Sequence, residues 1–196
     1  YTSYFYWLGA IDPNNKGYTE HAEDLLDRAG IAVSFQDSPC ESRKERYKGV
    51  ERRMLAKALD VLGIHYVKEI DYSPMTLKAL RRCELLAEVL TVVFAHGGDP
   101  NDPNSINPPE PDKVAAWSAA LVGLRQEVEE PAGRFSKDDF LAVLDKVLVL
   151  NDSTVEFPQE PLIAHFAEAA LATLDPYTVI EWPQQVPDFE KVMTNE

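Results

Sequence analysis

The chain has 196 residues, of which 45% are hydrophobic and 27% charged, and its formal net charge at neutral pH is −14. This composition is typical of a globular protein and argues against a disordered chain, which would hold too few apolar residues to form a core. The negative charge argues against general nucleic-acid binding, because phosphates would be repelled. The most apolar run, Leu85 to Ala95, contains Glu88 and is shorter than the roughly 20 residues of a membrane helix, so no membrane segment is predicted.

The N-terminal residues predict two helices joined by a turn. The aromatic cluster from Tyr4 to Trp7 favours a short helix packed on the body, and Asp12 to Gly17 has the composition of a turn. Thr19 is a suitable N-cap residue for a second helix, and Gly30 is a suitable C-terminal stop. We therefore expect that helix to begin at Thr19 and to end near Ala29.

A capping box predicts the start of the next helix, since Ser42 is followed three residues later by Glu45. Apolar residues then recur at helical spacing until Gly63, so one helix is expected over residues 42–62. The opposite face of this expected helix is basic, and it carries Lys44 and Lys48 together with five candidates for partner binding, which are Arg43, Arg46, Arg52, Arg53 and Lys57. A segregated basic face of this kind can bind an acidic partner, anionic lipid or nucleic acid, or can pair with the protein's own carboxylates.

A proline-rich stretch divides the predicted helices into two groups. Ser73 and Pro74 open a helix that is expected to reach Gly97, and residues 97–111 then contain five prolines without periodicity. We interpret this stretch as a linker or long loop between an N-terminal helical subdomain, 1–96, and a C-terminal one, 112–196.

The C-terminal half predicts three further helices. The first is capped by Asp112, and the second begins with a capping box of Ser136 and Asp139. A polar turn is expected over residues 151–157, followed by a broad apolar stripe of helical period from Leu162 to Leu174. The fold class is therefore mainly α, with about seven amphipathic helices in two helical subdomains joined by a Pro/Asn-rich loop and no substantial sheet.

Few residues have the spacing of a metal site or a catalytic site. The four histidines form no His-x-x-x-His pair, and Cys40 and Cys83 have no metal spacing, which leaves one disulfide or two free thiols open. An EF-hand-like loop would place Asp12, Asn14, Glu20 and Glu23 at calcium-ligand positions. Lys16 stands where a ligand oxygen is expected, so we predict no metal and no cofactor and keep calcium as an alternative.

The last 35 residues carry a resemblance to a known family. A helix of small residues ending in Leu174, the Asp175-Pro176-Tyr177-Thr178 turn, Trp182-Pro183 and a final Asp188-Phe189-Glu190-Lys191 follow one another. This arrangement resembles the region just before the PDZ domain in carboxyl-terminal processing (tail-specific) serine peptidases. The residues that carry this structural motif are Leu174, Asp175, Pro176, Tyr177, Thr178 and Trp182.

The resemblance implies that the chain is a non-catalytic N-terminal helical module of such a peptidase, serving assembly, oligomerisation or control of substrate access. The family's serine nucleophile and lysine base lie downstream of the PDZ domain, and nothing in this chain matches their motifs, so no catalytic residue is carried over. The implied partners are the downstream PDZ and peptidase domains, a second copy of the chain and protein substrates of the parent, and the implied compartment is periplasmic or extracytoplasmic. The alternatives are an EF-hand-like calcium-binding helical protein and a stand-alone helical adaptor for a protein partner.

Overall fold

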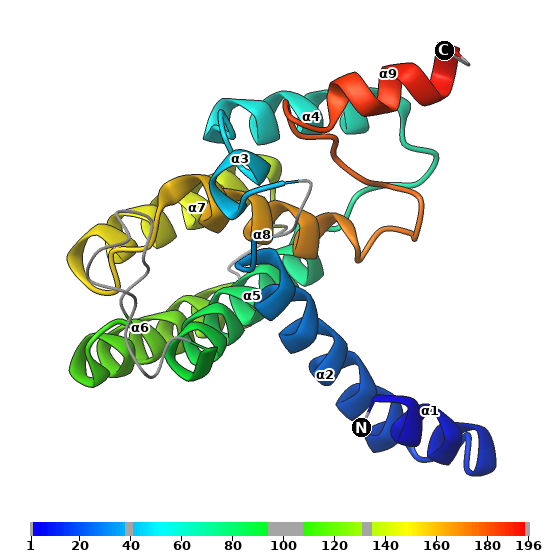
Figure 1. The fold of residues 1–196 in the computed structure, drawn as a ribbon, viewed down its shortest axis with the longest axis vertical. Helices are drawn as coiled ribbons and strands as arrows, with labels where there is room; N and C mark the ends of the chain where they lie inside the picture. The colour runs from blue at the N-terminus through cyan, green and yellow to red at the C-terminus, as the bar shows by residue number, and fades with distance from the viewer. Residues whose placement is uncertain (1, 38–40, 94–107, 131–134, 195–196) are drawn as a thin grey trace.

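The computed structural model describes residues 2–37, 41–93, 108–130 and 135–194, and the regular secondary structure of these residues is helix, with no strand (Figure 1). The predicted mainly α fold class is confirmed. The helices of the described residues are α1 (Thr2–Ile11), α2 (Lys16–Ser34), α3 (Arg43–Arg46), α4 (Arg52–His65), α5 (Tyr72–Val93), α6 (Pro111–Glu129), α7 (Lys137–Ser153), α8 (Gln159–Leu171) and α9 (Val186–Thr194).

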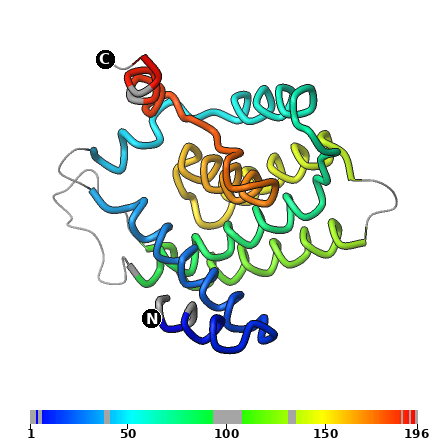
Figure 2. The backbone as a smooth tube through the Cα atoms, turned by 90° about the vertical axis from the view of Figure 1, so that its right-hand side faces the viewer, coloured from blue at the N-terminus to red at the C-terminus, as the bar shows by residue number. Residues whose placement is uncertain are grey.

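Helix α8 is the centre of the fold, and other helices surround it (Figure 2). The sequence predicts a one-sided apolar stripe here, yet residues on all sides of the helix are buried, from Pro161 to Leu171 with Glu168 as a partly exposed exception. Small side chains such as Ala164 and Ala167, both fully buried, allow neighbouring helices to approach closely. A helix that is apolar all round belongs in a core.

Helix α5 packs against α8 and also contacts α2, α6 and α7, while α7 contacts both α6 and α8. Helices α3, α4 and α9 lie toward one end of the molecule, while α1 packs against α2 at the other end, where the two project from the body (Figure 1). The indole of Trp117 on α6 is fully buried and donates a hydrogen bond of 3.1 Å to the carbonyl of Cys83 on α5. Tertiary packing of apolar faces therefore holds these helices.

Helix α2 is longer than the sequence predicts, since it begins at Lys16 and continues through Gly30 to Ser34. The prediction that Thr19 caps the helix and Gly30 stops it was wrong. Beyond Gly30 the helix buries Ile31, and Phe35 immediately after it is also buried. Burial of these two side chains offsets the roughly 1 kcal/mol that an interior glycine costs.

The expected single helix over residues 42–62 is two helices. The capping box of Ser42 and Glu45 is present, but α3 ends after four residues and α4 begins only at Arg52. Gly49 between them has φ of 81°, a left-handed conformation that reverses the chain and that glycine adopts readily. Gly63 does not end α4, which runs to His65.

The C-terminal half follows the prediction more closely. The capping box of Ser136 and Asp139 is confirmed, whereas α6 begins at Pro111 with Glu110 as N-cap, so the predicted Asp112 cap was wrong. Proline is favoured at the first helical position, because a backbone N–H there would have no acceptor within the helix and proline has no N–H to leave unpaired. Helix α8 spans Gln159–Leu171 and thus ends before Leu174, since the N–H groups of residues 173 and 174 bond the carbonyls of residues 170 and 171 in tighter turns.

The predicted polar turn over residues 151–157 begins inside α7 and is held by a buried amide. Asn151 is 1% exposed, accepts a hydrogen bond from the N–H of Phe157 and donates one to its carbonyl, both 2.9 Å long. The Asn151 side chain thereby satisfies both backbone hydrogen-bonding groups of Phe157, as a neighbouring strand would in a sheet.

The division into subdomains stays a prediction, and most of the linker, residues 97–107, lies outside the described residues. One hydrophobic core takes side chains from both sides of that stretch, among them Leu55 and Leu86 on one side and Phe140 and Phe166 on the other.

Candidate functional site: the junction between α8 and α9

The residues of the predicted family motif lie in the junction segment, residues 172–185, which leads from the central helix to α9. Asp175 organises its first turn, because its carboxylate accepts hydrogen bonds from the N–H groups of Tyr177 and Thr178, both 2.8 Å, and from the Thr178 hydroxyl at 2.6 Å. These bonds favour the charged carboxylate, so they hold the pKa of Asp175 below its ordinary value. Tyr66, at the end of α4, adds a fourth bond.

Trp182 fixes the other end of the junction segment. Its ring is 1% exposed, and its indole N–H donates a hydrogen bond of 2.8 Å to Glu168 on α8. Burial raises the pKa of Glu168, although this hydrogen bond opposes the shift. The backbone N–H of Trp182 donates to Gln185 Oε1 at 2.8 Å and so closes the turn before α9. The segment is therefore bonded to the end of α4 through Asp175 and to α8 through Trp182.

A groove of about 440 Å³ lies between the junction segment and α4. We call it the junction groove. Its wall on α4 includes Met54, Ala58 and Val61, and its opposite wall includes Val179 and Trp182. Its charged lining residues are Lys57 and Glu181, and its lining, within the described residues, contains no serine, cysteine or histidine. An apolar groove of this kind binds apolar groups rather than performing chemistry.

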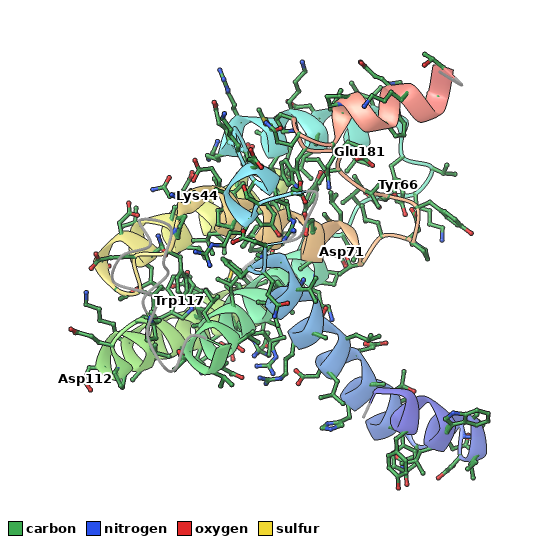
Figure 3. All side chains as sticks on the ribbon, viewed as in Figure 1. Lys44, Tyr66, Asp71, Asp112, Trp117 and Glu181 are labelled. Atoms are coloured by element: carbon green, nitrogen blue, oxygen red, sulfur yellow. The ribbon has the colours of Figure 1, made fainter. Side chains whose placement is uncertain are left out.

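Exposed apolar side chains occur on the junction segment, at the end of α4 and on α9. Tyr177 is 90% exposed, Val179 68% and Ile64, near the end of α4, 77%. Phe189 and Met193 on α9, four residues apart and therefore on one face of that helix, are 49% and 67% exposed. Tyr66 and Glu181 lie near this end of the molecule, close to α4 and α9 (Figure 3). Clustered apolar exposure of this kind marks interaction surfaces.

The sequence did not single out this groove. The sequence does contain apolar residues outside the predicted core positions. Val61 and Ile64 lie off the core stripe of α4, and Val179 and Ile180 lie in an irregular segment. Periodicity alone cannot separate a core face from an interaction face. Only the packing of α4 beside the junction segment brings these residues together.

The five basic residues predicted for partner binding do not share one face. Arg46 donates to Glu41 at 2.9 Å and to the carbonyl of Ser34 at 2.5 Å. Arg52 pairs with Asp145 of α7 through two hydrogen bonds of 2.5 and 2.8 Å, and Arg53 pairs with Glu51. The remaining two are apart, since Lys57 lines the junction groove and Arg43 lines a separate pocket. Partner binding by this set stays a prediction.

The residues of the EF-hand alternative are split between a turn and a helix. Asp12 and Asn14 lie in the turn before α2, whereas Glu20 and Glu23 lie within α2, which begins at Lys16. An EF-hand loop needs twelve residues that curl around the ion, and a helix from the fifth position removes that curl. The part of the chain that the structure describes holds no group of three or more His, Cys, Asp or Glu side chains that could bind a metal ion.

One serine lies beside a histidine, an arrangement that can activate a nucleophile. Ser34 Oγ is 3.0 Å from Nε2 of His165, a ring that is 1% exposed. The other ring nitrogen, Nδ1, faces Arg82 Nε at 3.4 Å, and because Arg82 can only donate, Nδ1 accepts and Nε2 carries the proton. Ser34 donates its own proton to the carbonyl of Ile31 at 2.7 Å.

These proton positions are the reverse of those in a serine nucleophile, where the histidine accepts the hydroxyl proton. Burial, with the nearby Arg82 charge, also lowers the pKa of His165 to about 3, so the ring is a weak base. Burial raises the pKa of the Cys83 thiol, which favours its unreactive neutral form. Cys40 and His96 lie outside the described residues. The pairing of Ser34 and His165 therefore joins α2 to α8 without forming a catalytic pair.

Comparisons with protein-family models, with curated proteins and with solved structures found no match. Among the described residues, the helices are too short or too polar to cross a membrane. The fold and the junction groove thus define a helical protein with an exposed apolar surface at the end where α4 and α9 lie.

Proposed function

We propose that this chain is a non-catalytic helical module that docks onto another part of a larger protein through the junction groove and the exposed apolar residues beside it. The observation that carries the proposal is an apolar groove of about 440 Å³ that is lined by the exposed Val179 and by Val186, the first residue of α9, together with the exposure of Phe189 and Met193 on that helix. Leaving such side chains in water costs about 25 cal/mol per Å² of apolar surface, which docking would recover.

The larger protein that we propose is a carboxyl-terminal processing serine peptidase, on the resemblance carried by Asp175, Pro176 and Trp182. The local structure suits that role. Asp175 turns the chain out of the central helix, Trp182 ties it to α8, and α9 then runs along the same end of the molecule as α4 (Figure 1). A segment held in this way would fix the direction in which a following PDZ domain leaves the helical body.

The proposed division of labour assigns catalysis to the parent's downstream domains and assembly or control of substrate access to this module. In support, the serine and histidine that lie together, Ser34 and His165, have their protons in the wrong places for nucleophilic catalysis. The adaptor alternative through residues 42–62 has less support, since Arg46, Arg52 and Arg53 already pair with the protein's own carboxylates.

The first experiment is to read the native coding sequence beyond Glu196. The proposal expects a PDZ-like domain and then a peptidase core with a serine and a lysine. The downstream part and this chain, produced separately, should bind each other in calorimetry. Val179→Asp should weaken that binding about tenfold or more, because it places a charge in the docked surface.

The matched control is Val149→Asp on α7, since Val149 is 70% exposed, close to the 68% of Val179, and does not line the junction groove. This control should leave binding unchanged. A stop codon directly after the codon for Glu196 would refute the peptidase assignment. Equal effects of the two variants would refute the junction groove as the docking surface, whatever domain follows.

A further inference from the structure

A second pocket, distinct from the junction groove, lies where α3 meets the start of α8. Its volume is about 410 Å³, and we call it the α3 pocket. Its lining residues are Phe35, Arg43, Lys44, Tyr47, Lys48, Pro158, Glu160 and Pro161. Lys44, on its rim, is well separated from Tyr66 and Glu181 beside the junction groove (Figure 3). Pockets of about 300–1,000 Å³ are the usual size for small-molecule sites.

The floor of the α3 pocket is apolar and well supported from behind. Phe35 and Tyr47 are 4% and 6% exposed. Both rings pack on His165, with ring centroids 5.8 Å apart for Phe35 and 5.6 Å apart for Tyr47. Pro158 and Pro161 add rigid rings from the start of α8. A floor of fixed rings suits an apolar ligand group, because little side-chain freedom is lost on binding.

The lining of the pocket has more cationic than anionic side chains. Its cations are Arg43, Lys44 and Lys48, and its one carboxylate is Glu160, in a chain whose total charge is −14. The cations belong to α3 and the residues just after it, whereas Glu160 belongs to α8. Arg46 braces this arrangement from outside the pocket, through the carbonyl of Ser34 and the carboxylate of Glu41.

We propose that the α3 pocket binds a small amphipathic carboxylate, with its apolar chain or ring on Phe35 and Tyr47 and its carboxylate beside Lys44 and Lys48. An anion without an apolar part is disfavoured, because it would leave the apolar floor of the pocket exposed to water. Glu160 on the opposite wall disfavours a second negative charge at the far end of the ligand. The site is independent of the proposed docking function of the junction groove.

The experiment measures binding of octanoate to the full chain by titration calorimetry, with amide chemical shifts to locate it. Octanoate should saturate and shift the amides of Lys44, Lys48 and Glu160. Octylammonium, of the same chain length and opposite charge, should bind at least tenfold more weakly, and inorganic phosphate should not compete.

Two sets of variants act in opposite directions. Lys44→Gln combined with Lys48→Gln should weaken octanoate binding about fivefold, because two favourable charges at an exposed rim are lost. Glu160→Gln should strengthen it about twofold, because a repelling charge is lost. Lys16→Gln combined with Lys68→Gln changes the total charge by the same amount at exposed sites away from the pocket and should have no effect.

The proposal is overturned if octanoate fails to saturate at millimolar concentration, or if octylammonium binds equally well. It is also overturned if phosphate competes, which would indicate an anion site without the apolar requirement. Equal weakening in the Lys44/Lys48 and Lys16/Lys68 variants would indicate a general charge effect and would overturn it too. The gain in affinity in Glu160→Gln guards against misfolding as an explanation, since a damaged pocket would lose affinity.

Discussion

The hydroxyl of Tyr66, at the end of α4, donates a hydrogen bond of 3.0 Å to Asp175 Oδ2, across 109 positions of the sequence. The bond joins α4 to the turn that follows the central helix, and it therefore links the two walls of the junction groove. Asp175 accepts three more bonds from Tyr177 and Thr178. A turn that could have been only local is in this way coupled to the tertiary structure.

The charge of Asp175 should make the junction dependent on acid pH. Its pKa lies below the ordinary value in the folded state, so its stabilisation is fully present above about pH 4 and is lost as the pH falls through the folded pKa. The difference in urea midpoint between the natural chain and Asp175→Asn should be constant from pH 7 to pH 5 and should shrink below about pH 4. A difference that persists undiminished at pH 2 would contradict this account.

Asn151 should be among the polar residues whose loss is most costly. Asn151→Ala leaves both the N–H and the carbonyl of Phe157 without their buried partner. We expect a loss of about 2–4 kcal/mol in the free energy of unfolding, measured by urea denaturation. Ser153→Ala, two positions along the same helix and exposed, should cost less than about 0.5 kcal/mol. Similar losses of unfolding free energy in both variants would contradict the structural role assigned to Asn151.

His165 should make folding stability fall between neutral and mildly acid pH. Its pKa is lowered to about 3, so the unfolded chain binds more protons than the native chain below about pH 6.5. The stabilisation from the neutral ring is complete above the unfolded pKa and decreases as the pH falls, with a slope of up to about 1.4 kcal/mol per pH unit.

Urea denaturation at pH 7, 6 and 5 checks this expectation. The slope should flatten in His165→Gln, whatever the absolute stability of that variant. An unchanged slope in His165→Gln would mean that His165 does not carry the effect.

Two glycines in one region should respond to alanine with opposite signs. Gly49 has φ of 81°, and an added methyl group would meet nothing closer than Pro183 at 4.0 Å, so Gly49→Ala should cost about 1–2 kcal/mol through the backbone alone. Gly63 lies within α4 with open space around it, so Gly63→Ala should stabilise the protein by about 0.5–1 kcal/mol. Urea denaturation measures both, and a gain in stability for Gly49→Ala would contradict the assigned conformation.

The sequence by itself determined the helical class, the two capping boxes and the Asp175-Pro176 turn. These features depend mainly on contacts within a few residues, such as Ser136 with Asp139, so the local sequence predicts them. It also indicated that the segment of α8 is apolar and faces the core, although it predicted a stripe where the structure has burial on all sides.

Only the tertiary structure decided where α2 ends, where the helix predicted over residues 42–62 breaks, and which apolar residues stay exposed. Gly30 has the features of a stop signal, yet Ile31 and Phe35 beyond it gain more from burial than the glycine costs. The junction groove and the α3 pocket follow the same principle. Their walls come from distant segments, Val61 facing Val179 and Tyr47 facing Pro161, and periodicity within one segment contains no information about which other segment will pack beside it.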